Sequence, residues 1–256
     1  MTDPAAQLVE QALVRPRYLA GPGDPAWVTA ALHRAAGWSY GHDPLVPRVQ
    51  LTSPDQLAVL HLEPDPDQPW WVVRHHRTNA NPAWSVSFGA RTPVEIIAAF
   101  TDALTAPAPA ETASSPYEPL LAAGWQQGRD HDGLTSPDGI ADVEHFSEAG
   151  SNSWFIDVAI GGDPEGQVWK AHLSGATPPH LITAVTGALA VPAPIARDPH
   201  RLPHLGHHLH TTTAQVPAPD VAFALERRID ALTARRPSNP PAPPPPRKSP
   251  APRRHR

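Results

Sequence analysis

The chain has 256 residues, no cysteine, 35 prolines and a formal net charge of −5. This length suits one large domain or two small ones, and the lack of cysteine excludes disulfides and thiolate metal sites. No stretch approaches the roughly 18 uninterrupted apolar residues of a membrane helix, and the first residues lack the pattern of a secretory signal, so we expect a cytoplasmic protein.

The sequence of residues 18–105 predicts a helix, then four or five antiparallel strands, and then a second helix. Asp24 and Pro25 start the first helix with a side-chain cap and a proline at its first position. Apolar residues that alternate with polar ones predict strands at residues 49–52, 57–63, 70–75 and 84–88. Thr92 and Glu95 predict a capping box for the second helix, whose apolar stripe should lie on the sheet.

Residues 116–191 repeat this pattern. Three anchors recur: Gly-Trp at 37 and 124, Leu-Thr-Ser-Pro-Asp at 51 and 134, and Thr-Pro at 92 and 177. The offsets, 87, 83 and 85 residues, differ only by loop lengths. The sequence therefore predicts an α+β fold of two tandem repeats with one strand order, each an antiparallel sheet with flanking helices packed on one face.

The residues also carry a resemblance to a known family. The run Tyr18 to Pro25, the Leu-Thr-Ser-Pro-Asp turns, the pair Trp70-Trp71 and the run Phe88 to Ile97 resemble the DUF317 family of Streptomyces and related actinobacteria, which often occurs as two tandem copies. The resemblance covers roughly residues 18–195. It implies the tandem arrangement but no activity.

Five segments lie outside the repeats. They are an N-terminal segment (1–17) with a short helix expected at 5–14, a linker (106–115), a Pro/His-rich linker (192–219), an amphipathic helix (220–235) and a basic, Pro-rich tail (236–256) that we expect to be disordered. All 25 acidic residues precede Arg235, so the chain from that residue onward is purely basic.

Two of these segments suggest ligands. The weak metal candidates are His204, His207, His208 and His210, although their spacing matches no defined metal site and a solvated linker explains them as well. Weak, non-specific contacts to nucleic acid are expected from the basic tail, through Arg235, Arg236, Arg247, Lys248, Arg253, Arg254 and Arg256. A solubilising tail is the alternative, and no cofactor is indicated.

Catalytic signatures are weak. The best ingredients for acid–base chemistry are His75-His76, Asp130-His131-Asp132 and His145, but no motif pairs them. An enzyme with an unrecognised site therefore stays an alternative.

An apolar patch gives the main functional hypothesis. Strand alternation places Leu57, Val59, Trp70 and Val72 on the face opposite the helices of the first repeat. Such a patch must be covered. We expect the sheet of the second repeat to cover it face to face, through Ile140 and Phe155, with a second copy or an external protein as alternatives. The main interpretation is thus a non-catalytic binding or interaction module, and the runner-up is a DNA-associated accessory protein that uses its basic tail.

Overall fold

The two repeats have the same order of elements. The computed structural model describes residues 7–41, 48–64, 70–109, 115–128, 133–148, 151–161 and 166–235. Repeat 1 contains α1 (Ala26–Arg34), β2 (Ser39–Gly41), β3 (Val49–Thr52), β4 (Ala58–Leu62), β5 (Trp71–His75), β6 (Trp84–Phe88) and α2 (Val94–Thr105). Repeat 2 contains α3 (Glu118–Ala122), β7 (Gln126–Gln127), β8 (Gly133–Thr135), β9 (Ala141–Glu148), β10 (Ser151–Ala159), β11 (Gln167–Ser174) and α4 (Pro179–Ala190). The predicted tandem α+β architecture is confirmed.

The two sheets join edge to edge. The ten described strands form one open sheet in the order β2-β3-β4-β5-β6-β11-β10-β9-β8-β7. At its centre β6 pairs antiparallel with β11, with Ser87 opposite His172. The expected face-to-face packing of the two sheets is therefore wrong. Without this contact β6 and β11 would each be the edge strand of a separate sheet, and their pairing satisfies the backbone groups along both edges.

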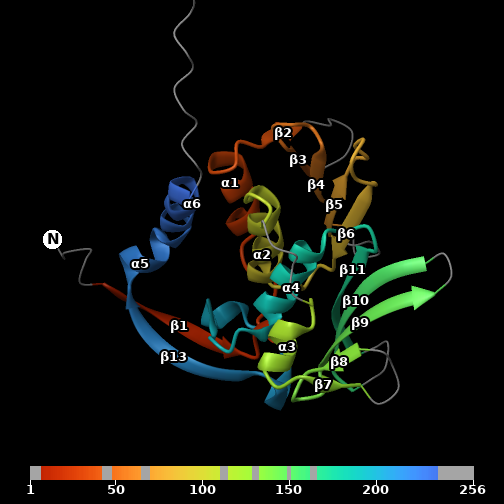
Figure 1. Ribbon diagram of the computed structural model, residues 1–256. Helices are drawn as coiled ribbons and strands as arrows, with labels where there is room; N and C mark the ends of the chain where they lie inside the picture. Colours follow the sequence, from red (N-terminus) through yellow and green to blue (C-terminus); the bar gives the residue numbers. More distant parts are fainter. Residues whose placement is uncertain are drawn as a thin grey trace, which may run out of the picture.

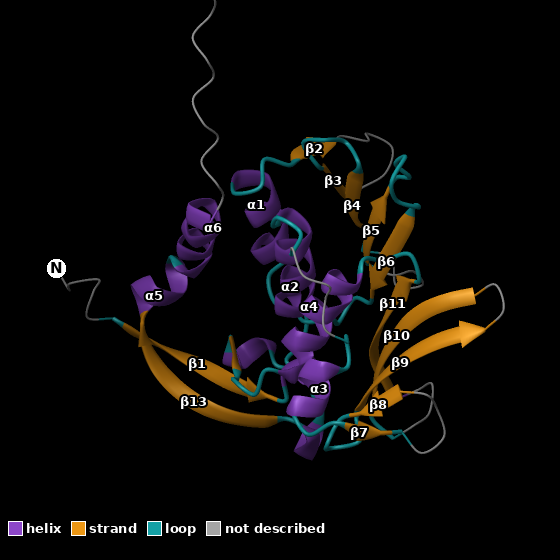
Figure 2. Ribbon diagram, in the orientation of Figure 1, coloured by secondary structure: helices purple, strands orange, loops and turns teal. Residues whose placement is uncertain are grey.

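One face of this sheet carries the helices. Helices α1 to α4 lie on the same side (Figures 1 and 2), where α2 packs against α4, α1 against α2, and α3 against α4. Buried side chains alternate along the strands and face these helices, and a single core cluster spans both repeats. Ile140, expected on the outer face, is buried in that core because it lies in the turn before β9, where strand alternation does not yet apply.

The segment before α1 ties repeat 1 to repeat 2. The Tyr18 hydroxyl donates a hydrogen bond to Asp138 at 2.6 Å, and the Trp169 indole N–H donates one to the Tyr18 carbonyl at 2.7 Å. Burial and the Asp138 carboxylate raise the pKa of Tyr18 well above its ordinary value. The run Tyr18 to Pro25, which resembles the DUF317 family, thus includes a residue that holds the two repeats together.

The Ser-Pro-Asp turns have one geometry. The Ser53 hydroxyl donates to the Asp55 carboxylate and accepts the Ala58 N–H, and the matching residues of repeat 2 make the same hydrogen bonds. The hydrogen bond from Ser53 lowers the pKa of Asp55. The next residue has a positive φ of 61° at Gln56 and 72° at Gly139.

The helix starts were predicted only in part. The Asp24 carboxylate accepts the Ala26 N–H at 2.9 Å, as a cap should. The prediction of a capping box at the start of α2 is wrong. The Thr92 hydroxyl is buried without a hydrogen-bond partner among the described residues, and Glu95 pairs with Arg197 instead. Arg197 donates two charge-assisted hydrogen bonds, of 2.6 and 2.7 Å, to the Glu95 carboxylate, which therefore does not cap the backbone at the helix start.

A second, smaller sheet forms where a helix (5–14) and a Pro/His-rich linker (192–219) were expected. Strand β1 (Leu8–Arg15) lies where a helix was expected, and it pairs along its whole length with β13 (His210–Pro217) and at one end with β12 (Ile195–Arg197). The Pro/His-rich segment therefore contains strands as well as 3-10 turns (Pro199–Arg201 and Gly206–His208), and a further 3-10 turn (Arg17–Leu19) follows β1. Partners some 200 residues away, not local propensity, decide this structure.

The predicted C-terminal helix is split. Phe223 separates α5 (Ala218–Ala222) from α6 (Ala224–Arg235). The α6 stripe of Leu225, Ile229 and Leu232 packs on α1. Among the described residues, every helix is too short or too polar to span a membrane.

Candidate interaction surface on the open sheet face

The open sheet face is the side of the ten-stranded sheet that the described helices leave bare (Figure 2). In repeat 1 it presents Val59 and His61 from β4 and Val72 and Arg74 from β5. In repeat 2 it presents Asp142, Glu144 and Phe146 from β9 and Phe155 and Asp157 from β10, while Ser85, Ser87, Lys170 and His172 lie along the centre.

Two of the four residues of the predicted patch lie in strands of this face. Val59 and Val72 are half-buried there. Leu57 precedes β4 and is also half-buried. Trp70 precedes β5, and its half-buried side chain packs against the main core. The sequence reasoning missed Phe146, which is 43% exposed on β9. Polar residues flank Phe146 on both sides, so the sequence around it lacks the apolar alternation that predicts a strand.

Comparing the repeats position by position shows that the core face is alike and the open face is not. With the offset of 83 residues, the core pairs are Ala58 and Ala141, Leu60 and Val143, Trp71 and Trp154, and Val73 and Ile156. The matching open-face pairs are Val59 and Asp142, His61 and Glu144, Val72 and Phe155, and Arg74 and Asp157. Packing against the helices explains the first set, whereas the fold does not require the second set to differ in this way.

The two halves of the face therefore differ in charge. Burial lowers the pKa of His61, and the charges of Arg48 and Arg74 lower it further. Burial raises the pKa of Asp157, with a further contribution from Asp142, while Lys170 opposes the shift. The lowered pKa favours a neutral His61 imidazole, so the positive charge of repeat 1 comes from Arg48 and Arg74, whereas Asp142, Glu144 and Asp157 make repeat 2 mainly anionic.

The centre of the face is polar but offers no recognisable catalytic arrangement. His172 Nε2 lies 3.1 Å from the Ser153 hydroxyl, and its ring contacts Phe155. Among the described residues, no hydrogen bond joins His172 to a carboxylate that would orient it as a base. A hydrolytic triad is therefore not assembled at this position.

The other predicted acid–base residues have structural surroundings. His75 stacks on Trp84 with ring centroids 5.1 Å apart, and His145 stacks on Trp154 at 4.5 Å and is hydrogen-bonded to Asn152 at 2.7 Å. The run 130–132 lies outside the described residues.

The predicted ligand residues are spread along the C-terminal segment. His204 precedes the turn Gly206–His208, and His210 begins β13. The rings of His207 and His208 lie 3.9 Å apart, but in the described part of the chain no three His, Asp or Glu side chains are grouped to hold a metal ion. Arg235 ends α6, and the tail positions Arg236, Arg247, Lys248, Arg253, Arg254 and Arg256 lie outside the described residues.

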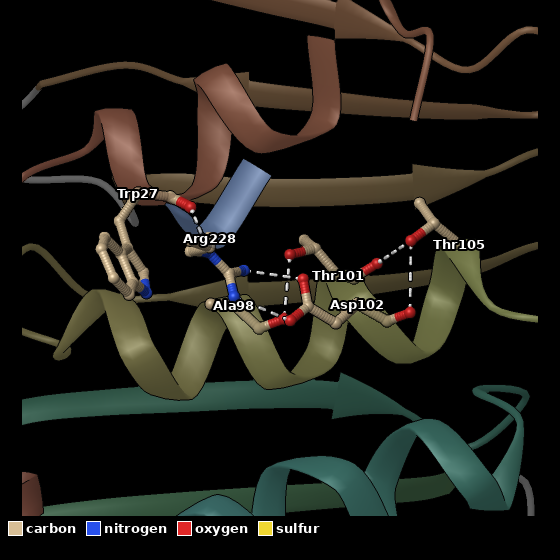
Figure 3. Close-up of polar contacts among 6 residues, drawn as sticks. All are labelled: Trp27, Ala98, Thr101, Asp102, Thr105 and Arg228. Atoms are coloured by element: carbon tan, nitrogen blue, oxygen red, sulfur yellow. Dashed lines mark hydrogen bonds and ion pairs between the residues drawn. The ribbon is translucent and has the colours of Figure 1, made fainter. Parts of the chain in front are cut away.

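A cleft of about 580 Å³ lies between α1, the end of α2 and α6. Its walls are mainly Ala and Leu side chains, with Asp102 and Arg235 as the charged groups. Asp102 is bound by Arg228, which also donates to the Trp27 carbonyl (Figure 3). This carboxylate is already engaged in fixing α6, so the cleft lacks an available acid–base pair.

Residues 52–110 and 135–195 match the family model described as SPDY, a domain of unknown function (DUF317). The chain carries two tandem DUF317 domains. Each match runs from the end of the second strand of a repeat through its last helix, so the DUF317 domains supply β4 to β6 and β9 to β11, the middle of the open face. No curated protein and no solved structure matches the chain.

Proposed function

We propose that this protein is a non-catalytic interaction module that binds a protein partner through the open face of its paired DUF317 sheets. The observation that supports this most directly is the uncovered set of apolar side chains on the middle strands, Val59, Val72, Phe146 and Phe155, in a surface that the described helices do not reach. Burying each such side chain contributes roughly 1.5–3 kcal/mol, so a partner that covers them gains substantial free energy.

The size of the face suits a protein partner. Ten strands about 4.8 Å apart, each about five residues long at 3.3 Å per residue, give a face of roughly 800 Å², which is the area one partner buries in a standard protein interface. Nucleic acid fits less well, because phosphates would be repelled by Asp142, Glu144 and Asp157 on repeat 2.

Site-specific photo-cross-linking in host cells tests this function. A photo-reactive amino acid replaces Val72 in one variant, Phe155 in a second, and Glu118 on α3, which is exposed on the helix side, in a control. We expect the first two variants to give an adduct of one defined mass, which the additional change Arg74→Glu weakens. Adducts that form equally from position 118, or none from positions 72 and 155, contradict the proposal.

A further inference from the structure

The two halves of the open face complement each other. Repeat 1 offers branched aliphatic side chains and cationic groups, and repeat 2 offers phenylalanines and carboxylates. At equivalent positions, the imidazole of His61 is replaced by the carboxylate of Glu144, and Arg74 by Asp157. When one half of a surface complements the other half, the surface can bind a second copy of the same chain that is related by a two-fold rotation.

Strand register shows which residues would meet. Backbone pairing aligns one continuous row across the sheet: His61, Val72, Ser87, His172, Phe155 and Glu144. Consider a two-fold axis that runs parallel to the strands, above the boundary of β6 and β11. It places the same row of a second copy over this row, in the opposite order. Val72 then faces Phe155 of the other copy, His61 faces Glu144, and Ser87 faces His172.

The neighbouring row behaves in the same way. It contains Val59, Arg74, Ser85, Ser174, Ser153 and Phe146, and reversal brings Val59 onto Phe146 of the other copy. The third row contains Glu63, Trp70, Gly89, Lys170, Asp157 and Asp142. It is less favourable, since reversal brings Glu63 towards Asp142 and Trp70 towards Asp157. Arg48, 3.9 Å from Glu63, offsets this repulsion. Sheets that pack face to face cross at about 30°, so the contacts near the axis decide the fit.

An axis perpendicular to the strands would be worse. It would lay repeat 1 on repeat 1, with cationic groups facing each other, and repeat 2 on repeat 2, with Glu144 and Asp142 near their own copies. Like charges placed opposite each other suppress an association by several kcal/mol. The charge pattern therefore selects a single arrangement.

We infer that the open face binds a second copy of this chain, so that repeat 1 of each copy lies on repeat 2 of the other in a closed two-fold dimer. This inference rests on the proposed use of the open face as a binding surface. It adds the partner and the register.

Complementary substitutions across the row test the register. In Val72→Glu or Phe155→Arg alone, both symmetric contacts place a charge against an apolar side chain, so we expect dimerisation to weaken at least about a hundredfold. In an equimolar mixture of the two variants, a heterodimer has one Glu–Arg contact and one unchanged Val–Phe contact. Association should therefore return.

Sedimentation of the full-length chain gives the readout, with the dimer at twice the monomer mass of 27.5 kDa. Circular dichroism verifies that each variant is folded. The control is Leu121→Glu, which changes a side chain that is 56% exposed on α3 and should leave the dimer intact.

Three results overturn the inference: an unsubstituted chain that stays monomeric, a single variant that associates as the unsubstituted chain does, or a mixture that does not recover. The cross-linking experiment separates the two proposals. A cross-linked adduct with a different protein leaves the interaction module standing and removes the second copy as its partner, whereas the absence of any adduct removes both.

Discussion

Replacing Arg228 by Ala should release α6 without unfolding the rest of the protein. The Arg228 guanidinium donates two hydrogen bonds to Asp102, at 2.7 and 3.0 Å, and one to the Trp27 carbonyl, at 3.0 Å (Figure 3). It also lies 5.1 Å from the centre of the Trp27 ring. Beyond this contact, α6 is held by a small apolar cluster with α1 and by the pair Arg34–Glu226.

The size of the effect follows from burial. The Arg228 side chain is 14% exposed and that of Asp102 is 31% exposed. A hydrogen bond to a charged group contributes about 1.5–3 kcal/mol, but water reaches part of Asp102 and the three bonds are not additive. We therefore expect a loss of about 2 kcal/mol in the stability of α6 against local opening. Amide hydrogen exchange along α6 should become about 30-fold faster, while the strands of the main sheet keep their protection.

A matched control is the second ion pair between α1 and α6. Arg34 and Glu226 also form a bidentate pair, with both hydrogen bonds at 2.6 Å, but their side chains are 47% and 45% exposed. Exposed pairs of this kind are screened by water and ions, so Arg34→Ala should accelerate exchange much less. If the two variants accelerate exchange equally, or if Arg228→Ala leaves α6 unchanged, burial does not determine the strength of these pairs.

Two further predictions concern the sheet. Gln56→Gly should stabilise the protein by about 0.5–1 kcal/mol in urea unfolding, because φ is 61° at this position, whereas Gly139→Ala, where φ is 72°, should destabilise it by a similar amount. Asp157→Asn should stabilise the protein at neutral pH, because burial raises the folded-state pKa of Asp157 and the charged form costs stability above that pKa. The gain should disappear below the ordinary carboxyl pKa, where both states are protonated, and a gain that is the same at all pH values would contradict the burial argument.

Local patterns were enough to predict what lies within each repeat. The alternation of Trp84, Val86 and Phe88 with serines places these apolar side chains in the core, and the structure buries all three. Alternation likewise placed Val59 and Val72 on the opposite face. Such predictions succeed because strand phase and helix periodicity depend on neighbouring residues.

Long-range contacts could not be predicted in this way. The pairing of β6 with β11 is made by backbone groups, which every sequence possesses, so no side-chain pattern announces it. The capping box failed for a related reason. Thr92 and Glu95 have the right spacing, but Arg197 lies 102 residues beyond Glu95 and binds its carboxylate more strongly than a helix N–H would.

The divergence of the two open faces has a consequence for assembly. If both repeats carried the same self-complementary face, each could bind a repeat of a different chain, and the contacts would extend into open chains of molecules. With aliphatic and cationic residues on repeat 1, and aromatic and acidic residues on repeat 2, a face of one kind binds only the other kind. In the proposed two-fold dimer, both halves of a chain are occupied by the same neighbour, so association stops at two. The open-face positions that distinguish the two repeats, such as His61 and Glu144, would thus set the pairing of repeat 1 with repeat 2, while the core positions keep one fold in both repeats.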